Sequence, residues 1–375
     1  MTRPLEMLTD QGVAVWVDSI ARDWLHKGEL RRLRDEYSVV GVTSNPTIFQ
    51  KAMGEGSLYD DDIARMAHEG RDAQSIFEAL ALDDIRAAAD DMEPVHRRTG
   101  GLDGRISFEL PPHIANDTEA SVREARRLFD ALARPNVFIK IPATAAGVPA
   151  IRESIAAGIN VNVTLIFSIE RYREVIGAFM TGLEELADSG GDLSEVASVA
   201  SFFVSRVDSN VDKKLQAIVD RGGPDAERAR VRLGSAAIDN AKLAWEAFEE
   251  RFSSQRWRAL AGGGARPQRP LWASTSTKNP AYRDVRYVEE LIARGSVNTM
   301  PVETLYAFQD HGEVPGQTIL RDLERAHRLW SDLGELGIEE PVVMRELEEE
   351  GVERFADSYW GAVETIEAKR AEALR

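Results

Sequence analysis

The segment "VFIKIPATAAG", residues 137–147, has the pattern of a β-strand that separates two environments. Because alternate residues of a strand share a face, Val137, Ile139 and Ile141 form one apolar surface. Lys140 points the opposite way. The segment therefore predicts a strand whose outer face is covered by helices and whose inner face carries an ammonium group.

Similar β-rich runs recur along the chain. They are separated by stretches whose apolar residues repeat at helical spacing, such as 121–134 and 168–190. Alternating strands and helices favour parallel pairing, and eight strands favour closure into a barrel. The expected fold class is therefore α/β, a (β/α)8 TIM barrel with additional helices. Besides 137–143, the expected strands are 13–19, 38–46, 105–110, 160–168, 196–206, 269–277 and 296–304.

The remaining length fits around one such barrel, so residues 1–375 are expected to form a single domain. An insertion at 47–104 separates the second and third strands, and a charged helical extension covers 315–375. Residues 253–270 are predicted to be a loop before the seventh strand. The three glycines at 262–264 lack the spacing of a phosphate-binding loop, so they are expected to form a flexible linker.

Composition excludes several classes of protein. The chain has 43% hydrophobic and 29% charged residues, and no run approaches the roughly 18 apolar residues of a membrane span. The amino terminus has no apolar signal region, so a cytoplasmic location is expected. The absence of cysteine excludes disulfides and thiolate chemistry. A net charge of -17 argues against nucleic-acid and anionic-membrane partners, which need a basic face.

Polar side chains are predicted on the inner faces of four strands, near their carboxyl ends. In the fifth strand, the same alternation places Val161, Val163 and Leu165 outside. Barrel interiors normally hold branched apolar side chains, so a polar set there predicts an active site. The inward polar residues are Asp18, Thr43, Asn45, Lys140, Asn160, Asn162 and Thr164.

Each of these residues also has a simpler interpretation when taken alone. A strand lysine such as Lys140 is often ion-paired, and Asp18 has the position of a helix cap. Asn45 precedes Pro46 and suits a turn. Their convergence on one barrel interior favours function over these alternatives.

The chemistry that suits a lysine and a carboxylate in such a place is imine formation. Apolar surroundings solvate an ammonium group poorly, which favours the neutral amine that attacks a ketone. The resulting iminium withdraws electrons, so a carboxylate such as Asp18 can remove a substrate hydroxyl proton while a carbon–carbon bond breaks. Asparagine amides suit sugar hydroxyls, because both groups donate and accept hydrogen bonds.

Seven segments, from about residue 13 to 310, resemble blocks of the transaldolase family, a class I aldolase-type group. The segments after residue 310 are similar to the helices of its longer bacterial branch. In order, the seven segments are "VDSIARD" (17–23), "GVTSNPTIF" (41–49), "VFIKIPAT" (137–144), "GINVNVTLIFS" (158–168), "ASFFVSRVD" (200–208), "LWASTSTKNP" (271–280) and "NTMPVETL" (298–305).

The resemblance implies a role for each matching position. Lys140 would form the Schiff base, Asp18 would act as acid and base at the bond being cleaved, and Glu109 with Thr164 would hold a proton-carrying water. Asn45 and Asn162 would bind the dihydroxyacetone part of the substrate. The same pocket would be lined by Ser201 and Thr43.

The phosphate end of the substrate is implied to contact Arg206, a position where the family has an arginine. In the seventh-strand block many members have a second arginine, whereas this chain has Ser274 and Ser276 followed by Lys278. Phe203 matches the position where fructose-6-phosphate aldolases have a tyrosine that helps to release the enamine. Its missing hydroxyl implies transfer rather than release.

The sequence thus predicts a transaldolase of the non-oxidative pentose phosphate pathway, acting on sugar phosphates. The alternatives are a fructose-6-phosphate aldolase that releases dihydroxyacetone and a non-catalytic sugar-phosphate-binding barrel. No cofactor or metal is expected, because the lysine is the electron sink and the six histidines show no ligand spacing. The chain is expected to be a monomer or a homodimer.

Overall fold

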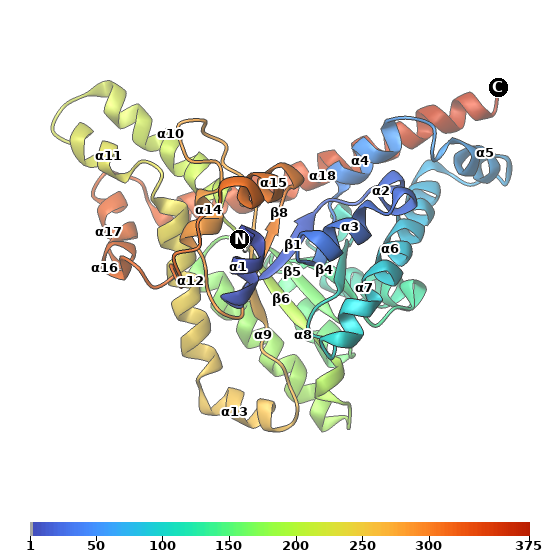
Figure 1. Ribbon diagram of the computed structural model, residues 1–375, viewed down its shortest axis with the longest axis horizontal. Coiled ribbons are helices and arrows are strands. Elements are labelled where there is room, and N and C mark those ends of the chain that lie inside the picture. The colour runs from blue at the N-terminus through green and yellow to red at the C-terminus, as the bar shows by residue number, and fades with distance from the viewer. Residues whose placement is uncertain (1–2) are drawn as a thin grey trace.

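Eight parallel strands close into a barrel in the computed structural model, which describes residues 3–375 (Figure 1). Each strand pairs with the next in sequence, and β1 closes the ring against β8. All eight predicted strands and the barrel class are confirmed. The strands are β1 (Ala14–Asp18), β2 (Val39–Thr43), β3 (Arg105–Glu109), β4 (Val137–Pro142), β5 (Val161–Ile166), β6 (Ser198–Phe203), β7 (Arg269–Ala273) and β8 (Val297–Met300).

Helices surround the barrel and bury apolar side chains against it. Helix α7 (Thr118–Leu132) is typical: the Asp117 side chain accepts a hydrogen bond from the backbone of Ala120 at its start, and Leu128 is buried. The other helices between strands or before β1 are α1 (Pro4–Asp10), α2 (Arg22–Lys27), α3 (Glu29–Glu36), α8 (Gly147–Ala156), α9 (Ile169–Asp188), α10 (Ser205–Arg221), α11 (Ala226–Arg232), α12 (Ala236–Phe252) and α14 (Arg286–Glu290), with short 3-10 turns at Pro112–Ile114 and Leu193–Glu195.

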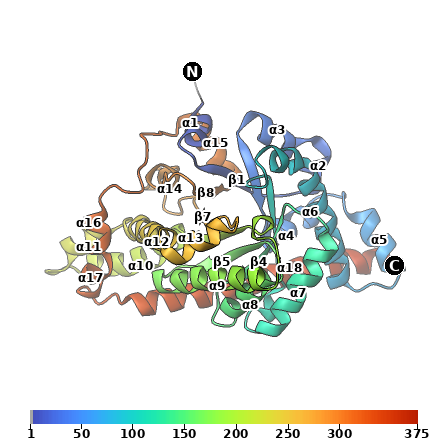
Figure 2. The same ribbon diagram turned by 90° about the horizontal axis from the view of Figure 1, so that it is seen from below.

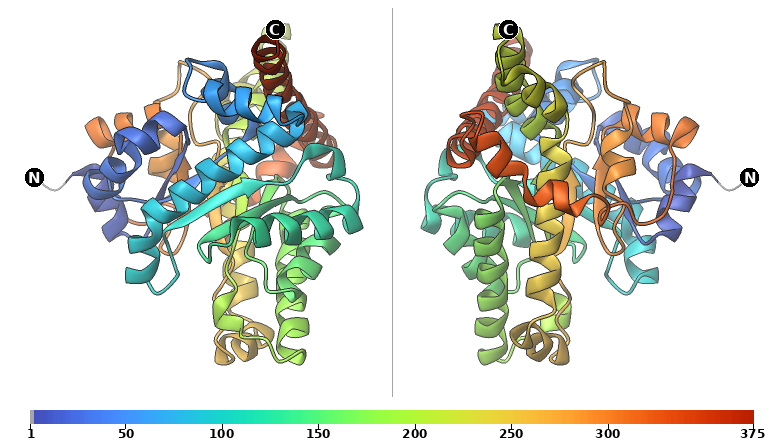
Figure 3. Two further views of the ribbon diagram at one scale, coloured as in Figure 1. Left: turned by 90° about the vertical axis from the view of Figure 1, so that its right-hand side faces the viewer. Right: turned by 90° about the vertical axis from the view of Figure 1, so that its left-hand side faces the viewer.

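The predicted insertion and the predicted carboxyl-terminal extension pack against each other. The insertion folds as α4 (Pro46–Gly54), α5 (Asp60–His68) and α6 (Ala73–Arg98). After β8 come α15 (Val302–His311), α16 (Leu323–His327), α17 (Leu329–Gly334) and the long α18 (Glu340–Ala373). Figure 2 shows α18 running from the side of α17 to the side of α5, in contact with α4, α5 and α6. Figure 3 shows it at the opposite end of the molecule from α13.

The predicted loop at 253–270 is wrong in part, because α13 (Gln255–Gly262) lies within it. The Ser254 hydroxyl accepts a hydrogen bond from the Trp257 backbone N–H and begins the helix. Trp257 is buried and stacks with Phe179 of α9 at 6.4 Å between ring centroids. Gly262 closes the helix, so the glycine run is not wholly a linker.

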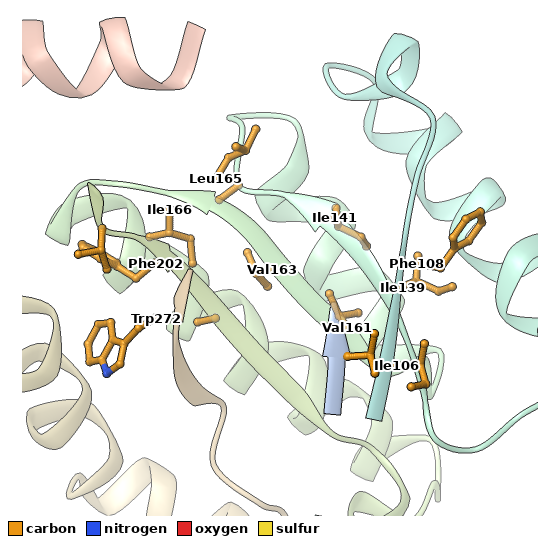
Figure 4. Close-up of a cluster of buried hydrophobic side chains, with 14 of the residues drawn as sticks. Ile106, Phe108, Ile139, Ile141, Val161, Val163, Leu165, Ile166, Phe202 and Trp272 are labelled. Carbon is orange, nitrogen blue, oxygen red and sulfur yellow. The ribbon is translucent and has the colours of Figure 1, made fainter. Parts of the chain in front are cut away.

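The outer face of the strands carries the apolar surface that alternation predicts. Ile139, Ile141, Val161 and Val163 are fully buried there, between the barrel and its helices (Figure 4). The prediction for Leu165 is wrong. The β5–β6 register shifts between Val163 and Ile166, and Leu165 has a φ of 56°. This bulge turns Leu165 into the wall of the central cavity, away from Val163.

The amino-terminal half of the barrel interior holds an apolar cluster, with the Arg105 guanidinium 5.1 Å from the Phe138 ring centroid. A small inner cluster consists of Ala14, Trp16, Phe138, Val199, Leu271, Ala273 and Val297. Gly41 of β2 leaves room for the largest member, because a Cβ at that position would stand 2.4 Å from the Trp16 indole. This plug fills the lower half of the barrel, so a cavity can open only toward the carboxyl ends of the strands.

Candidate active site

A cavity of about 670 Å³ opens at the carboxyl ends of the strands. Its walls come from the strand ends, the loop after β7 and helices α4 and α18. Of the residues predicted for the site, those that line it are Asp18, Thr43, Asn45, Glu109, Lys140, Thr164, Ser201, Phe203, Arg206, Ser274, Ser276 and Lys278. Asn162 is not part of the lining.

Lys140 lies on the cavity floor and is 7% exposed. Strand pairing places Glu109 of β3 beside it, and its Nζ is 2.8 Å from Glu109 Oε1. The same Nζ donates a hydrogen bond to the Ser44 carbonyl at 2.8 Å. These two contacts hold the amine at a fixed place between β2 and β3.

Glu109 is the carboxyl group that pairs with this amine. Burial raises the pKa of Glu109, and the Lys140 charge offsets part of that rise. Its Oε2 is buried without a hydrogen-bond partner among residues 3–375. A carboxyl group with a raised pKa, 2.8 Å from an ammonium, is placed to accept a proton from it and to return it.

Asp18 ends β1 on the other side of the cavity. The Thr43 hydroxyl donates to its Oδ1 at 2.7 Å, and Asn45 Nδ2 is 3.5 Å from Oδ2. The Thr299 hydroxyl lies 2.7 Å from that of Thr43. Thr43 uses its only hydrogen on Asp18, so Thr299 donates to Thr43. Burial raises the pKa of Asp18, partly offset by the charge of Lys140.

Asn162 lies beside Lys140 in the strand register, but it is fully buried below the cavity. Its Nδ2 donates to Ser107 at 3.0 Å, and its Oδ1 accepts from Ser201 at 2.7 Å. Asn162 therefore fixes the rotamer of Ser201, which does line the cavity. Asn160 is tied to the Pro135 carbonyl and the Ala197 N–H before β5 begins, away from the cavity.

Positive charge gathers on the cavity wall at the start of α10 and in the loop after β7. Arg206 lies with its guanidinium carbon 5.0 Å from the Phe203 ring centroid, and its Nη1 is buried without a partner among the described residues. Lys278 Nζ donates to Ser276 at 2.7 Å. Ser274, with a φ of 57°, has its hydroxyl 2.9 Å from that of Ser205. Burial lowers the pKa of Lys278, and the Arg206 charge lowers it further.

Several lining residues were not predicted from the sequence. Thr299 lies inside the quoted segment 298–305, so the alternation of side chains along β8 could have identified it as inward-facing. The α18 residues carry no such signal, because nothing in a charged helix shows which face covers a distant barrel mouth. They are Gly351, Arg354, Phe355, Asp357 and Ser358.

Within residues 3–375, no group of three or more His, Cys, Asp or Glu side chains is arranged to hold a metal ion. Among the same residues, no helix combines the length and apolar character needed to cross a membrane.

Comparison with known proteins places this chain in a family. Residues 15–366 match the family model described as Transaldolase/Fructose-6-phosphate aldolase. The chain is 51% identical to a protein named Transaldolase from Parafrankia sp. (strain EAN1pec), with 100% of both chains covered. It is 50% identical to a Transaldolase from Thermobifida fusca, with 96% of both covered, and 47% identical to Transaldolase 2 from Streptomyces coelicolor, with 98% of both covered. The chain belongs to the transaldolase/fructose-6-phosphate aldolase family.

Proposed function

We propose that Lys140 carries a dihydroxyacetone unit from a ketose phosphate to an aldose phosphate. The protein is a transaldolase, as its family and its full-length relatives indicate. The donors are sedoheptulose 7-phosphate or fructose 6-phosphate, and the acceptors are glyceraldehyde 3-phosphate or erythrose 4-phosphate. The observation that carries the residue assignment is the 2.8 Å pair of Lys140 and Glu109 on the floor of the cavity.

The first step needs a neutral amine. Glu109 takes a proton from the Lys140 ammonium, which its raised pKa favours. The amine then attacks the ketone, and the carbinolamine loses water to give the iminium. We propose that Glu109 and Thr164, which both line the cavity, pass protons to and from this oxygen through a water.

Cleavage follows on the opposite wall. Asp18 removes the proton from the hydroxyl on the fourth carbon, and the bond between the third and fourth carbons breaks. The electron pair moves into the iminium and gives an enamine, while the aldose phosphate leaves. Thr43 holds the Asp18 carboxylate by its 2.7 Å hydrogen bond, and Asn45 and Ser201 face the hydroxyls of the retained three-carbon unit.

Transfer needs the enamine to survive until an acceptor aldehyde arrives. Phe203 lines the cavity and offers no hydroxyl to activate a water against the enamine. Addition to the acceptor reverses the cleavage step, with Asp18 returning the proton, and hydrolysis frees Lys140. Arg206, Lys278, Ser274 and Ser276 supply the charge and hydroxyls for the phosphate group.

The covalent assignment is tested by incubating the protein with fructose 6-phosphate and borohydride, followed by intact mass and peptide mapping. The expected result is one reduced dihydroxyacetone unit on Lys140. Lys140→Ala is expected to abolish the adduct, whereas Lys213→Ala, which changes an exposed lysine of α10, keeps it. Folded protein that binds substrate but gives no adduct on Lys140 would sink the imine mechanism.

Two alternatives make different predictions in the same assay. A fructose-6-phosphate aldolase gives the adduct but releases free dihydroxyacetone without an acceptor. A non-catalytic binding barrel binds sugar phosphates with no adduct and no dependence on Lys140. Both alternatives come from the sequence. The cytoplasmic location and the monomeric or dimeric state also come from the sequence and stay predictions.

A further inference from the structure

One face of helix α18 forms part of the cavity wall. Gly351, Arg354, Phe355 and Ser358 all line the cavity, and their spacing of three, four and seven residues places them on one side of the helix. The extension is therefore not only a cover over the insertion helices. It contributes side chains to the site at which the substrate would lie.

Gly351 brings the α18 backbone close to the cationic wall. A Cβ at this position would stand 3.1 Å from Leu165 Cδ2 and 3.7 Å from Arg206 Nη1. A side chain larger than alanine here would push the helix off Arg206. The close approach places Arg354, one turn further along, at the same edge of the cavity as Arg206.

Three cations then share this edge: Arg206, Lys278 and Arg354. The charge of Arg354 lowers the pKa of Arg206, after burial, and the charge of Arg206 lowers that of Lys278. Arg206 Nη1 has no hydrogen-bond partner among the described residues. The charges of Glu350, Glu109 and Asp18 act in the opposite direction on the pKa of Arg206, which stays lowered. The remaining repulsion among the cations and the unused Arg206 donor, in a chain of net charge -17, indicate a place built for an anion.

Among residues 3–375, Arg354 pairs with Glu350, one turn earlier on α18. Side-chain exposures of 63% for Arg354 and 44% for Glu350 make this a surface pair, which contributes little to stability. Such a pair is easily exchanged for a stronger one. A phosphate dianion can accept two hydrogen bonds from the guanidinium, as a carboxylate can, and it carries more negative charge. It can therefore replace a partly solvated Glu350 as the partner of Arg354.

We propose that Arg354 is a direct ligand of the substrate phosphate and leaves Glu350 for it when the sugar phosphate binds. The inference rests on the proposed function for the identity of the anion, but the cation cluster itself is a feature of the cavity.

The test compares four variants on the folded, full-length chain. Arg354→Gln removes the charge, Arg354→Lys keeps it without the fork, and Glu350→Gln removes the competing carboxylate. Arg345→Gln is the matched control, because it changes an exposed α18 arginine about two and a half turns away, on the opposite face. The readouts are KM and kcat for fructose 6-phosphate, and the Kd of inorganic phosphate by calorimetry.

Arg354→Gln is expected to raise both KM and the phosphate Kd about tenfold, the effect of one charge-assisted hydrogen bond, with a smaller change in kcat. Arg354→Lys should fall between, Glu350→Gln should lower the phosphate Kd, and Arg345→Gln should match the wild type. A structural role for Arg354 would not give opposite signs for the two members of one ion pair.

The inference is overturned if Arg354→Gln leaves the phosphate Kd and KM within about twofold of the wild type, or lowers only kcat. Failure of the proposed function looks different, because the wild type would then transfer no dihydroxyacetone unit to an acceptor aldose phosphate. Phosphate binding would still report on Arg354 in that case, since calorimetry does not depend on catalysis.

Discussion

The two halves of the barrel interior are built from the same strands, yet they are opposite in character. Trp16 and Phe138 belong to the apolar plug, whereas Asp18 and Lys140, two residues further along the same strands and on the same face, line the cavity. Two residues along a β-strand, one repeat of its side-chain alternation, therefore separate a packed core from a polar cavity. The lower half stabilises the barrel, and the upper half is arranged for chemistry.

The polar half lowers the stability of the fold. Burial raises the pKa of both Asp18 and Glu109, so their ionised forms are less favourable in the folded chain than in water. The attraction of Lys140 offsets only part of this for each group. Neutralising one carboxylate should therefore raise the stability of the fold and remove activity. No substitution in the apolar plug is expected to have this pair of effects.

Asp18→Asn gives the largest expected effect. Loss of the base should lower kcat/KM for transfer by about 10²- to 10⁴-fold, while Tm at pH 7 rises by about 1–3 °C. The folded pKa of Asp18 is raised above its ordinary value of 3.8, so its unfavourable ionisation develops as pH rises from there. The gain in Tm should thus be present at neutral pH and disappear below about pH 4. Steady-state kinetics and calorimetry across pH measure both.

Asp72→Asn is the matched control for the stability measurement. Asp72 caps α6 with its side chain accepting from Ser75, and this hydrogen bond lowers its pKa. The ionised form is favoured there, so Asn should not raise Tm at pH 7, and kcat should match the wild type. If Asp18→Asn failed to raise Tm, the cost assigned to the polar half would be wrong.

The plug can be disturbed at Gly41 without touching the cavity. A Cβ in Gly41→Ala would meet the Trp16 indole at 2.4 Å, so the variant should lose about 1–3 kcal/mol of unfolding free energy. Chemical denaturation measures this loss. Kinetic constants should change little if the two halves are independent at temperatures well below Tm.

Two companions sharpen the result for Gly41. A Cβ added at Gly177 of α9 would meet nothing within 4 Å, so Gly177→Ala should be neutral or stabilising by about 1 kcal/mol. Trp16→Leu combined with Gly41→Ala should destabilise less than the sum of the single changes, because the clash is relieved. Strict additivity would show that the Trp16 contact is not the cause.

Much of the polar half was predictable because alternation along a strand is a local rule. Parity placed Lys140, Asp18 and Thr43 on the inner face, and the structure places them on one cavity. The rule failed at Leu165, where a bulge with positive φ resets the alternation. A bulge depends on the register with a neighbouring strand, which a single run of residues does not contain.

Contacts between distant segments were not predictable in this way. Arg354 lies far beyond Lys140 in the sequence, and only the path of α18 across the barrel brings them to one cavity. Alternation correctly placed Asn162 on the inner face of β5, yet its amide is hydrogen-bonded to Ser107 and Ser201 below the cavity floor. Parity gives the face of a strand, whereas depth along the barrel axis decides between core and cavity.

Phe203 is an apolar residue of the polar half, and its replacement gives the smallest expected effect. Phe203→Tyr adds a hydroxyl inside the cavity, near Arg206, where it can orient a water toward the enamine. The ratio of free dihydroxyacetone to transfer product should rise a few-fold in the presence of acceptor. Phe203→Leu changes the shape of the wall without adding a hydroxyl, so its ratio should follow the wild type. An equal rise in both variants would mean that the Phe203 ring protects the enamine only by excluding water through its bulk. An unchanged ratio in Phe203→Tyr would show that the missing hydroxyl at this position does not determine acceptor dependence.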